Sequence, residues 1–236
     1  MAGKVKVLNL PRAIPVRMKI LVQAKGIDEL LDGGIETDSL TLMYGEAGSG
    51  KTNICLQLAR NVARMGHRTI YIDSEGVSPE RLRQMCGDDF DAVIPNILFY
   101  EPFSFEEQES QLDEAIRVAT SAKDIKLVIM DSATVFFRLK QGESDQGRSS
   151  LTYQIIHLLN LVRKLDISVV ITSQVYFDIE NKIVRPLGGH TLYHNAKTIL
   201  FLEKVDPGRR RMTIMKHRCI IEGRSTEFLL TSKGVE

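Results

Sequence analysis

The sequence predicts an α/β fold in which a mostly parallel central sheet is covered by helices on both faces and ends in a C-terminal antiparallel hairpin. Short apolar runs bounded by turn residues alternate along the chain with longer stretches in which apolar residues recur at helical spacing. This alternation is typical of parallel sheets that lie between two layers of helices. Residues 211–216 and 226–230 differ, because these two strand-like runs have no helix between them.

The expected elements can be placed by residue. The expected parallel strands are residues 40–44, 69–73, 97–100, 127–131, 168–172 and 198–202. The expected helices are residues 51–65, 79–85, 105–122 and 151–164. Ligands of such sheets gather at the carboxyl ends of the strands, so the polar residues that follow these apolar runs are the first candidates for function.

Composition favours one globular domain. The chain has 236 residues, of which 43% are hydrophobic and 26% charged, an ordinary balance for a protein with a sizeable core. No apolar run approaches the ~18 residues of a membrane span, and the N-terminus has no apolar core of the signal-peptide kind. Cys55, Cys86 and Cys219 lie far apart without CxxC spacing, which argues against disulfides and zinc. We therefore expect a cytoplasmic protein with no membrane partner.

A complete GxxxxGK[ST] motif lies where the strand 40–44 should run into a helix. Its residues, with the one that follows, are Gly45, Glu46, Ala47, Gly48, Ser49, Gly50, Lys51, Thr52 and Asn53. In this motif the glycines let backbone N–H groups turn inward around phosphate oxygens, and Lys51 reaches the β- and γ-phosphates. The hydroxyl of Thr52 ligates Mg²⁺. The sequence therefore predicts a site for a nucleoside triphosphate with Mg²⁺.

A carboxylate that suits the metal follows another expected strand. The four apolar residues 127–130 lead directly into Asp131. An aspartate delivered beside a phosphate loop in this way can hold Mg²⁺ through water or through the Thr52 hydroxyl. Many buried strands end in an aspartate at a turn, so the preceding phosphate loop is what favours the metal-binding interpretation.

Two more strand ends carry polar side chains that suit phosphate chemistry. Glu75 follows the strand 69–73 and can act as general base on a water in line with the γ-phosphate, whereas we expect Asp73 to be structural. The alternative for both carboxylates is turn and cap chemistry before the helix at 79–85. Gln174 follows another strand, where its amide can sense a γ-phosphate or belong to an ordinary loop.

Positive charge is unevenly distributed although the net charge is only +1. Residues 1–25 contain six Lys or Arg and no acidic residue, and the first dozen look like a flexible basic arm. Residues 204–224 contain seven Lys or Arg against two acidic residues, including the arginine run 209–211. Such runs are either solvated loop surface or a patch for nucleic acid, and charge alone favours the solvated surface.

Together these segments resemble the ATPase core of the RecA/RadA recombinase family, and the resemblance covers the chain from Gly26 to its end. Besides the phosphate loop, the resemblance is carried by 26–37 (GIDELLDGGIET), 73–76 with 79–81 (DSEG and PER), Asp131-Ser132 with Phe137-Arg138, and 188–192 (GGHTL). It implies a RecA-like P-loop core that binds ATP. It also divides the chain into a basic arm and lead-in strand at 1–25 and a RecA-like ATPase domain at 26–236.

The resemblance implies roles for single residues. Glu75 is then the catalytic base, Gln174 the γ-phosphate sensor that leads into a DNA-binding loop, and Arg81 the residue that stacks on adenine. Two mobile loops, 138–149 and 176–190, would contact single-stranded DNA. The candidate DNA-binding residues in them are Arg138, Lys140, Arg148, Tyr176, Lys182 and Arg185. The two aromatic residues at the start of the second loop either stack on bases or close the strand as core residues.

Departures from the full recombinase pattern point to an accessory role. The residues before Gly26 are too few for the helical N-terminal DNA-binding domain, no Phe-x-x-Ala docking motif appears there, and 216–223 lacks the proline that caps the neighbour's nucleotide. The chain is therefore similar to a core-only paralogue of the archaeal recombinases. We expect weak Mg²⁺-dependent ATPase activity in homologous recombination and DNA repair. The expected partners are single-stranded DNA or recombination intermediates, the RadA recombinase and a junction nuclease, bound by a monomer or small homo-oligomer.

Three other functions fit parts of the pattern. One is a filament-forming strand-exchange recombinase, against which the missing docking motif argues. Another is a nucleotide-gated binding module, in which ATP sets the conformation of the loop after Gln174 and a partner protein receives the signal. The third is an ATPase of the KaiC type with no role on DNA, and Arg138 and the 188–190 signature count against it.

Overall fold

The centre of the molecule is a nine-stranded sheet. The structure is a computed structural model that describes residues 18–139 and 145–236. The strands of the sheet are β3 (Ser39–Gly45), β4 (Arg68–Asp73), β5 (Ile97–Tyr100), β6 (Ile125–Asp131), β7 (Ser168–Ser173), β10 (Thr198–Asp206), β11 (Arg209–Lys216), β12 (Ser225–Thr231) and β13 (Gly234–Val235). Their order across the sheet is β13-β12-β11-β10-β3-β7-β6-β4-β5. The strands from β10 to β5 run parallel, and β11, β12 and β13 continue from β10 in antiparallel fashion. The predicted fold is confirmed.

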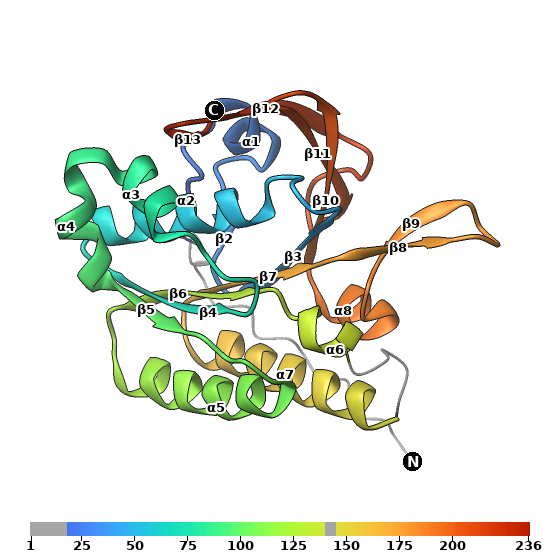
Figure 1. Cartoon of the computed structure of the whole chain (residues 1–236), viewed down its shortest axis with the longest axis horizontal. Coiled ribbons are helices and arrows are strands. Elements are labelled where there is room, and N and C mark those ends of the chain that lie inside the picture. Colours follow the sequence, from blue (N-terminus) through green and yellow to red (C-terminus); the bar gives the residue numbers. More distant parts are fainter. Residues whose placement is uncertain (1–17, 140–144) are drawn as a thin grey trace, which may run out of the picture.

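Helices cover both faces of this sheet (Figure 1). On one face lie α2 (Lys51–Arg64), α3 (Pro79–Cys86) and α4 (Phe90–Val93), with the short helices η1 (Gly87–Asp89) and η2 (Ile94–Asn96) beside them. On the other face lie α5 (Phe105–Ser121), α6 (Val135–Leu139), α7 (Asp145–Lys164) and α8 (Gly189–Asn195). The helix α1 (Lys25–Leu30) packs against β12.

The sheet separates two hydrophobic cores, which explains why its strands read as nearly continuous apolar runs. Strand β7 is buried at every position because α2 and α7 lie on its opposite faces. Ile54 and Leu58 of α2 belong to one core, whereas Leu112 of α5 and Leu158 of α7 belong to the other. Burial from both sides fixes the strands, so the polar residues at their carboxyl ends are held at one edge of the sheet.

The second predicted mobile loop is instead a two-stranded ribbon, formed by β8 (Val175–Asp178) and β9 (Ile183–Pro186). Asp178 closes the turn, because its carboxylate accepts hydrogen bonds from the backbone and side chain of Asn181 and from Arg185. The hydrogen bonds from Asn181 and Arg185 lower the pKa of Asp178 to about 2. The ribbon projects from the body of the molecule (Figure 1).

Other departures from the predicted elements are smaller. Helix α7 begins at Asp145 rather than at residue 151, so much of the first predicted loop is helical where the structure describes it. Helices α1, α6 and α8 were not predicted, and neither was the pairing of β1 (Lys19–Ile20) with β2 (Ile35–Glu36). Across residues 18–139 and 145–236, no helix has both the length and the apolar character to cross a membrane.

Candidate nucleotide and DNA site

The phosphate loop joins β3 to α2, and its glycines are required by its conformation. Gly48 has φ of +74° and Gly50 has φ of +103°, where a side chain is strained. A Cβ on Gly45 would lie only 2.1 Å from the backbone oxygen of Leu202 in β10, so this first glycine allows the neighbouring strand to pass. The Oγ of Ser49 is buried and has no hydrogen-bond partner within residues 18–139 and 145–236, which leaves a polar atom for a ligand in the loop.

Lys51 lies within the loop that it is predicted to serve. Its Nζ donates hydrogen bonds to the backbone oxygens of Gly45 at 2.9 Å and Glu46 at 3.0 Å. Burial lowers the pKa of Lys51, and the negative charges of Glu75 and Asp131 oppose that shift. The ammonium group is therefore close enough to both predicted carboxylates to feel their charge.

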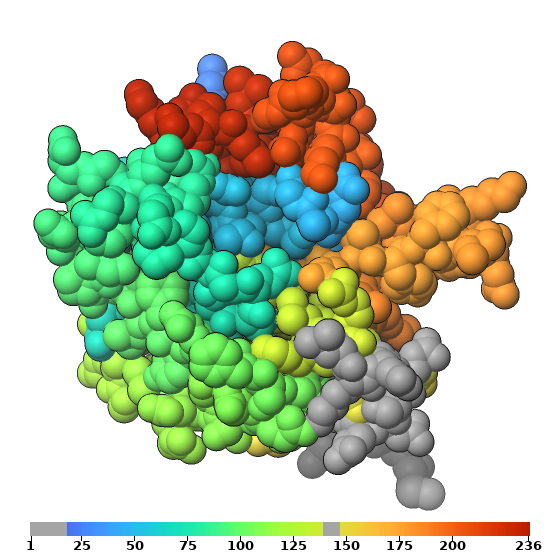
Figure 2. Space-filling view, viewed as in Figure 1, coloured from blue at the N-terminus to red at the C-terminus, as the bar shows by residue number. Residues whose placement is uncertain are grey.

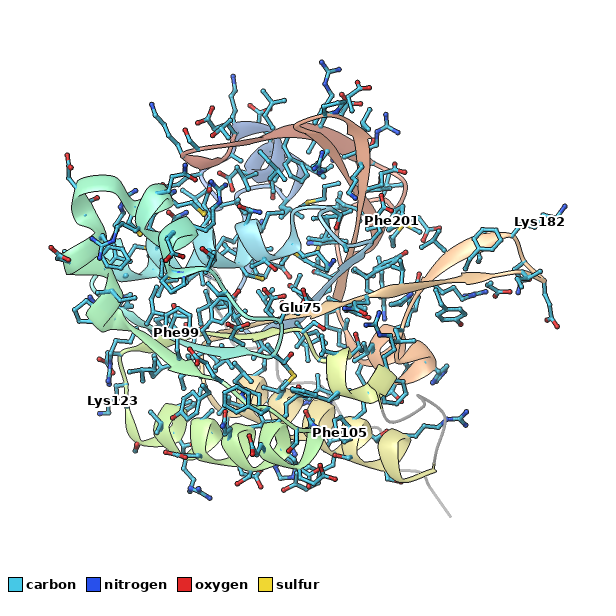
Figure 3. The ribbon with its side chains drawn as sticks, viewed as in Figure 1. Glu75, Phe99, Phe105, Lys123, Lys182 and Phe201 are labelled. Carbon is cyan, nitrogen blue, oxygen red and sulfur yellow. The ribbon has the colours of Figure 1, made fainter. Side chains whose placement is uncertain are left out.

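Glu75 and Gln174 meet at the mouth of the loop, although 99 positions separate them in the sequence. The Nε2 of Gln174 donates a hydrogen bond to Oε1 of Glu75 at 3.2 Å. A hollow of about 120 Å³ is lined by Ala47, Gly48, Gly50, Lys51, Thr52, Asn53, Glu75 and Gln174. Figure 3 places Glu75 near the middle of the molecule, beyond the ends of the parallel strands. The structure thus brings the predicted base, sensor and lysine together.

The hydrogen bonds of Asp73 and Glu75 distinguish their two carboxylates, both of which could have built the turn or capped the helix that follows it. The carboxylate of Asp73 accepts hydrogen bonds from the backbone N–H groups of Glu75, Gly76 and Val77, so Asp73 builds the turn. Ser78 caps α3, because its Oγ accepts a hydrogen bond from the backbone of Arg81. The carboxylate of Glu75 takes part in neither motif, and the Glu75 side chain remains exposed beside Gln174.

Asp131 is fully buried at the end of β6 and is held from both sides. One carboxylate oxygen accepts a hydrogen bond from the hydroxyl of Tyr71 in β4 at 2.8 Å. The other accepts one from the hydroxyl of Thr172 in β7 at 2.5 Å. Burial raises the pKa of Tyr71 well above its usual range, so the phenol stays protonated and donates. Sequence reasoning missed Tyr71 and Thr172, because only the register of neighbouring strands brings them to Asp131.

Arg81 does not line the hollow beside the phosphate loop. Its guanidinium donates to the side chain of Asn53, which does line that hollow, at 2.8 Å. It also donates to the side chain of Gln84 and to the backbone oxygens of Thr231 and Ser232. Arg81 therefore ties the start of α2 to α3 and to the turn between β12 and β13.

The candidate DNA-binding residues lie on α6, α7 and the ribbon. Arg138 is exposed at the end of α6, and Arg148 is exposed on the first turns of α7. Lys182 lies at the tip of the ribbon (Figure 3), which stands away from the body of the molecule in Figure 2. Arg185 faces Tyr176 across the ribbon. Lys140 lies outside the described residues.

The two aromatic residues of β8 are not core residues. Tyr176 is 43% exposed and Phe177 is 58% exposed, so the predicted alternative that they close the strand from inside is wrong. They lie on opposite faces of the ribbon because successive side chains of a strand alternate. Phe177 pairs across the ribbon with Val184. Both faces of the ribbon therefore offer apolar surface to a ligand.

The chain is similar to known proteins in sequence and in fold. The family model described as Rad51 matches residues 16–236. The chain belongs to the Rad51 family. A protein of Methanococcoides burtonii named "DNA repair and recombination protein RadB" is 44% identical over 223 residues, which cover 93% of this chain and 98% of that protein. A protein of Archaeoglobus fulgidus with the same name is 41% identical and covers 93% and 99%.

A solved structure agrees with these relatives. The structure titled "Crystal structure of the RadB recombinase" aligns with a TM-score of 0.80 at 32% identity, covering 92% of this chain and 98% of that one. The predicted resemblance to a core-only archaeal paralogue, RadB, is thereby confirmed. The phosphate-loop motif at residues 45–52 lies within the range that the family model matches.

Proposed function

We propose that this Rad51-family chain binds ATP at the phosphate loop, hydrolyses it weakly with Mg²⁺, and acts in homologous recombination and DNA repair as an accessory factor. The observation that carries this proposal is the meeting of Lys51, Glu75 and Gln174 around one hollow. These residues follow three different strands, and only the parallel sheet brings them together. The names of the RadB relatives support the role in repair and recombination.

The residues of the loop fit a nucleoside triphosphate. The positive φ angles of Gly48 and Gly50 support a loop whose amides turn toward phosphate. The Oγ of Ser49, which none of the described residues contacts by a hydrogen bond, is available to the ligand. Lys51 has neighbouring carboxylates but no ion pair among the described residues, so its ammonium group can move from the loop carbonyls to the β- and γ-phosphates. We assign residues 45–53 to ATP binding on this basis.

The side chains near the loop also fit Mg²⁺. Thr52 supplies a hydroxyl, and Asp131 supplies a carboxylate that Tyr71 and Thr172 already orient. No group of three or more His, Cys, Asp or Glu side chains suited to a metal occurs in the described part of the chain. This agrees with Mg²⁺, which takes most of its ligands from phosphates and water. When bound, Mg²⁺ supplies positive charge that offsets the charge developing on the phosphates.

Glu75 and Gln174 carry the chemistry in this proposal. The exposed carboxylate of Glu75 accepts a proton from the attacking water, and it is available to do so because only the backbone N–H of Glu75 takes part in the Asp73 turn. Gln174 holds Glu75 in the absence of nucleotide and turns its amide toward the γ-phosphate when ATP is present. Arg81 faces the adenine, with its guanidinium supported by Asn53.

DNA binding is assigned to the surface around the ribbon and to the N-terminal arm. Arg138, Arg148, Tyr176, Lys182 and Arg185 provide cationic and aromatic groups on neighbouring exposed elements, and the proposal extends to Lys140 from sequence alone. We propose that residues 1–25 act as a basic arm and lead-in strand, and that 26–236 form the ATPase domain. Single-stranded DNA or a recombination intermediate is the proposed partner, with RadA and a junction nuclease as protein partners of a monomer or small homo-oligomer.

A second candidate function is a nucleotide-gated binding module. It is favoured by the hydrogen bonds at the base of the ribbon, where the backbone oxygen of Gln174 accepts from the N–H of Leu187 at 2.8 Å. The hydroxyl of Ser173 donates to the oxygen of Leu187. A movement of Gln174 toward a γ-phosphate is therefore passed directly to the ribbon, with or without hydrolysis.

Nucleotide hydrolysis with and without single-stranded DNA tests the proposal and separates the two candidates. An ATPase acting on DNA shows Mg²⁺-dependent hydrolysis that DNA stimulates. A gated module binds ATP and changes its affinity for DNA or for RadA, yet DNA does not stimulate hydrolysis. Absence of ATP binding at millimolar nucleotide would refute both. Sizing the protein by light scattering in both nucleotide states reports its oligomeric state in the same experiment.

A further inference from the structure

Two basic side chains stand against the outer side of the phosphate loop. Arg210 of β11 donates a hydrogen bond from Nε to the backbone oxygen of Gly48 at 2.8 Å. Lys204 of β10 lies over the same residue, because a Cβ built on Gly48 would be 3.2 Å from its Cε and 3.4 Å from its Nζ. Neither residue lines the hollow that holds Lys51 and Glu75.

The path of β10 explains how these side chains reach the loop. Leu202 is the register partner of Gly45 at the start of the loop, and the two backbones almost touch there. Lys204 follows two residues later on the same face of the strand. The loop is thus built against β10, and the next strand, β11, adds Arg210 to the contact.

Two like charges face each other at this position, and their repulsion lowers the stability of the sheet. Lys204 and Arg210 are direct partners across β10 and β11, and like charges in that position destabilise a sheet. The neighbouring arginines of the same strand have acidic partners, since Arg211 pairs with Glu203 and Glu227 and Arg209 also pairs with Glu227. Across residues 18–139 and 145–236, neither Lys204 nor Arg210 forms an ion pair.

Contacts with backbone oxygens fix the guanidinium of Arg210. Besides Gly48, it donates through Nη1 to the oxygens of Asp206 and Arg209 in its own hairpin. A trans peptide directs its C=O and its following N–H to opposite sides. A hydrogen bond that holds the Gly48 oxygen toward Arg210 therefore directs the Ser49 N–H to the opposite side of the peptide, where it donates to the backbone oxygen of Glu46 at 3.2 Å, beside Lys51.

From these contacts we propose that Arg210 is a positioning residue for the phosphate loop, and that Lys204 adds positive charge on the same side of it. The ligand is the triphosphate of the nucleotide, so this inference rests on the proposed ATP binding. Arg210 acts on the phosphates through the Gly48–Ser49 peptide and touches neither the phosphates nor the attacking water. The run of arginines at 209–211, expected as solvated loop surface, is instead a strand in which alternate residues serve different faces.

The test uses Arg210→Met, which keeps the apolar stem but removes the donor, with Arg209→Met as the matched control. Binding of a methylanthraniloyl ATP analogue should weaken about five- to tenfold in R210M, in line with the loss of a partly exposed charged hydrogen bond, and change less than about twofold in R209M. The KM for ATP should rise by a similar factor while kcat stays within about twofold, because Glu75 and Gln174 are untouched. Arg210→Lys keeps the charge and should recover part of the affinity.

The melting temperature of Lys204→Met separates the proposed role from a purely structural one, because loss of a structural residue would lower that temperature. Removing one of two opposed like charges should raise the melting temperature of the nucleotide-free protein by about 1–2 °C and still weaken ATP binding. Circular dichroism confirms that each variant is folded. Wild-type ATP affinity in R210M, or an equal loss in R209M, would overturn the inference. If Lys51→Ala also binds ATP normally, the proposed function itself fails; if only K51A loses binding, this inference alone fails.

Discussion

Replacing Glu75 with glutamine should separate ATP binding from ATP hydrolysis. Glutamine keeps an oxygen that can accept the hydrogen bond from Gln174, so the 3.2 Å contact at the mouth of the loop can persist. It cannot accept a proton from water. Loss of a general base lowers rates by about 10²- to 10⁴-fold, which corresponds to about 3–5 kcal/mol of transition-state stabilisation. We therefore expect kcat to fall by at least a hundredfold in E75Q.

The same substitution should make ATP bind more tightly. A hollow of about 120 Å³ is about 6 Å across, which sets the scale for the separation between the Glu75 carboxylate and a phosphate in the loop. Two unit charges about 6 Å apart repel by about 0.7 kcal/mol in surroundings as polar as water, which is the limit that suits this exposed side chain. Removing that repulsion corresponds to about threefold tighter binding.

Equilibrium titration with a fluorescent ATP analogue and a steady-state phosphate-release assay measure the two effects. Glu101→Gln is the control, because Glu101 is also exposed and borders a neighbouring hollow that includes Glu75 but does not include Lys51. E101Q should change neither quantity by more than about twofold. Turnover by E75Q at the wild-type rate would refute the role of Glu75 as base, and unchanged or weaker ATP affinity would refute its placement beside the phosphates.

Four further outcomes follow from the same structure. Lys51→Ala should abolish binding of the ATP analogue without unfolding the protein, as checked by titration and circular dichroism. Deleting residues 1–12 removes three cations, so the slope of log K against log salt for single-stranded DNA should flatten by about 2 if each contacts a phosphate, and an unchanged slope would make the arm a bystander. Electron microscopy with DNA and ATP should show no regular helical filaments, because residues 216–223 lack the proline that the recombinase resemblance places over the neighbour's nucleotide. The pKa of Asp178 is about 2 in the folded ribbon, against about 3.9 for a free side chain. The hydrogen bonds of its carboxylate therefore stabilise the ribbon above about pH 4, and this stabilisation is lost as the pH falls through about 2. Hydrogen exchange of the ribbon amides in Asp178→Asn should match that of the wild type only at that low pH.

The elements that the sequence could predict are those fixed by burial on two sides or by a motif. Strands β3 to β7 and helices α2, α3 and α5 lie within a few residues of their predicted bounds, because their apolar periodicity and their turn residues act locally. The phosphate loop needed no tertiary information, since its glycines and Lys51 occur together in the chain. Glu75, Gln174 and Asp131 could be placed because the carboxyl ends of parallel strands meet at one edge of a sheet.

Residues whose position depends on strand register could not be predicted. Tyr71 lies within an apolar run and reads as a core residue, and only the pairing of β4 with β6 shows that its hydroxyl meets Asp131. Arg210 reads as one of three surface arginines, and only the pairing of β10 with β11 brings it to Gly48. The ribbon was missed for a different reason, since its polar turn and exposed aromatic residues resemble a loop until Asp178 closes it.

Gln174 contacts both the hollow at the phosphate loop and the base of the ribbon, so the proposed nucleotide binding and the position of the ribbon are linked. Its side chain lines the hollow and contacts Glu75, while its backbone oxygen accepts a hydrogen bond from Leu187 at the base of the ribbon, where β9 ends. A γ-phosphate that draws the amide away from Glu75 must therefore shift the balance of ribbon positions, by no more than its differential affinity for them. Coupling of this kind is reciprocal, so DNA that favours one ribbon position changes ATP affinity by the same factor by which ATP changes DNA affinity. In the proposed gated module, weak hydrolysis would be compatible with a strong functional effect, because binding alone would carry the signal.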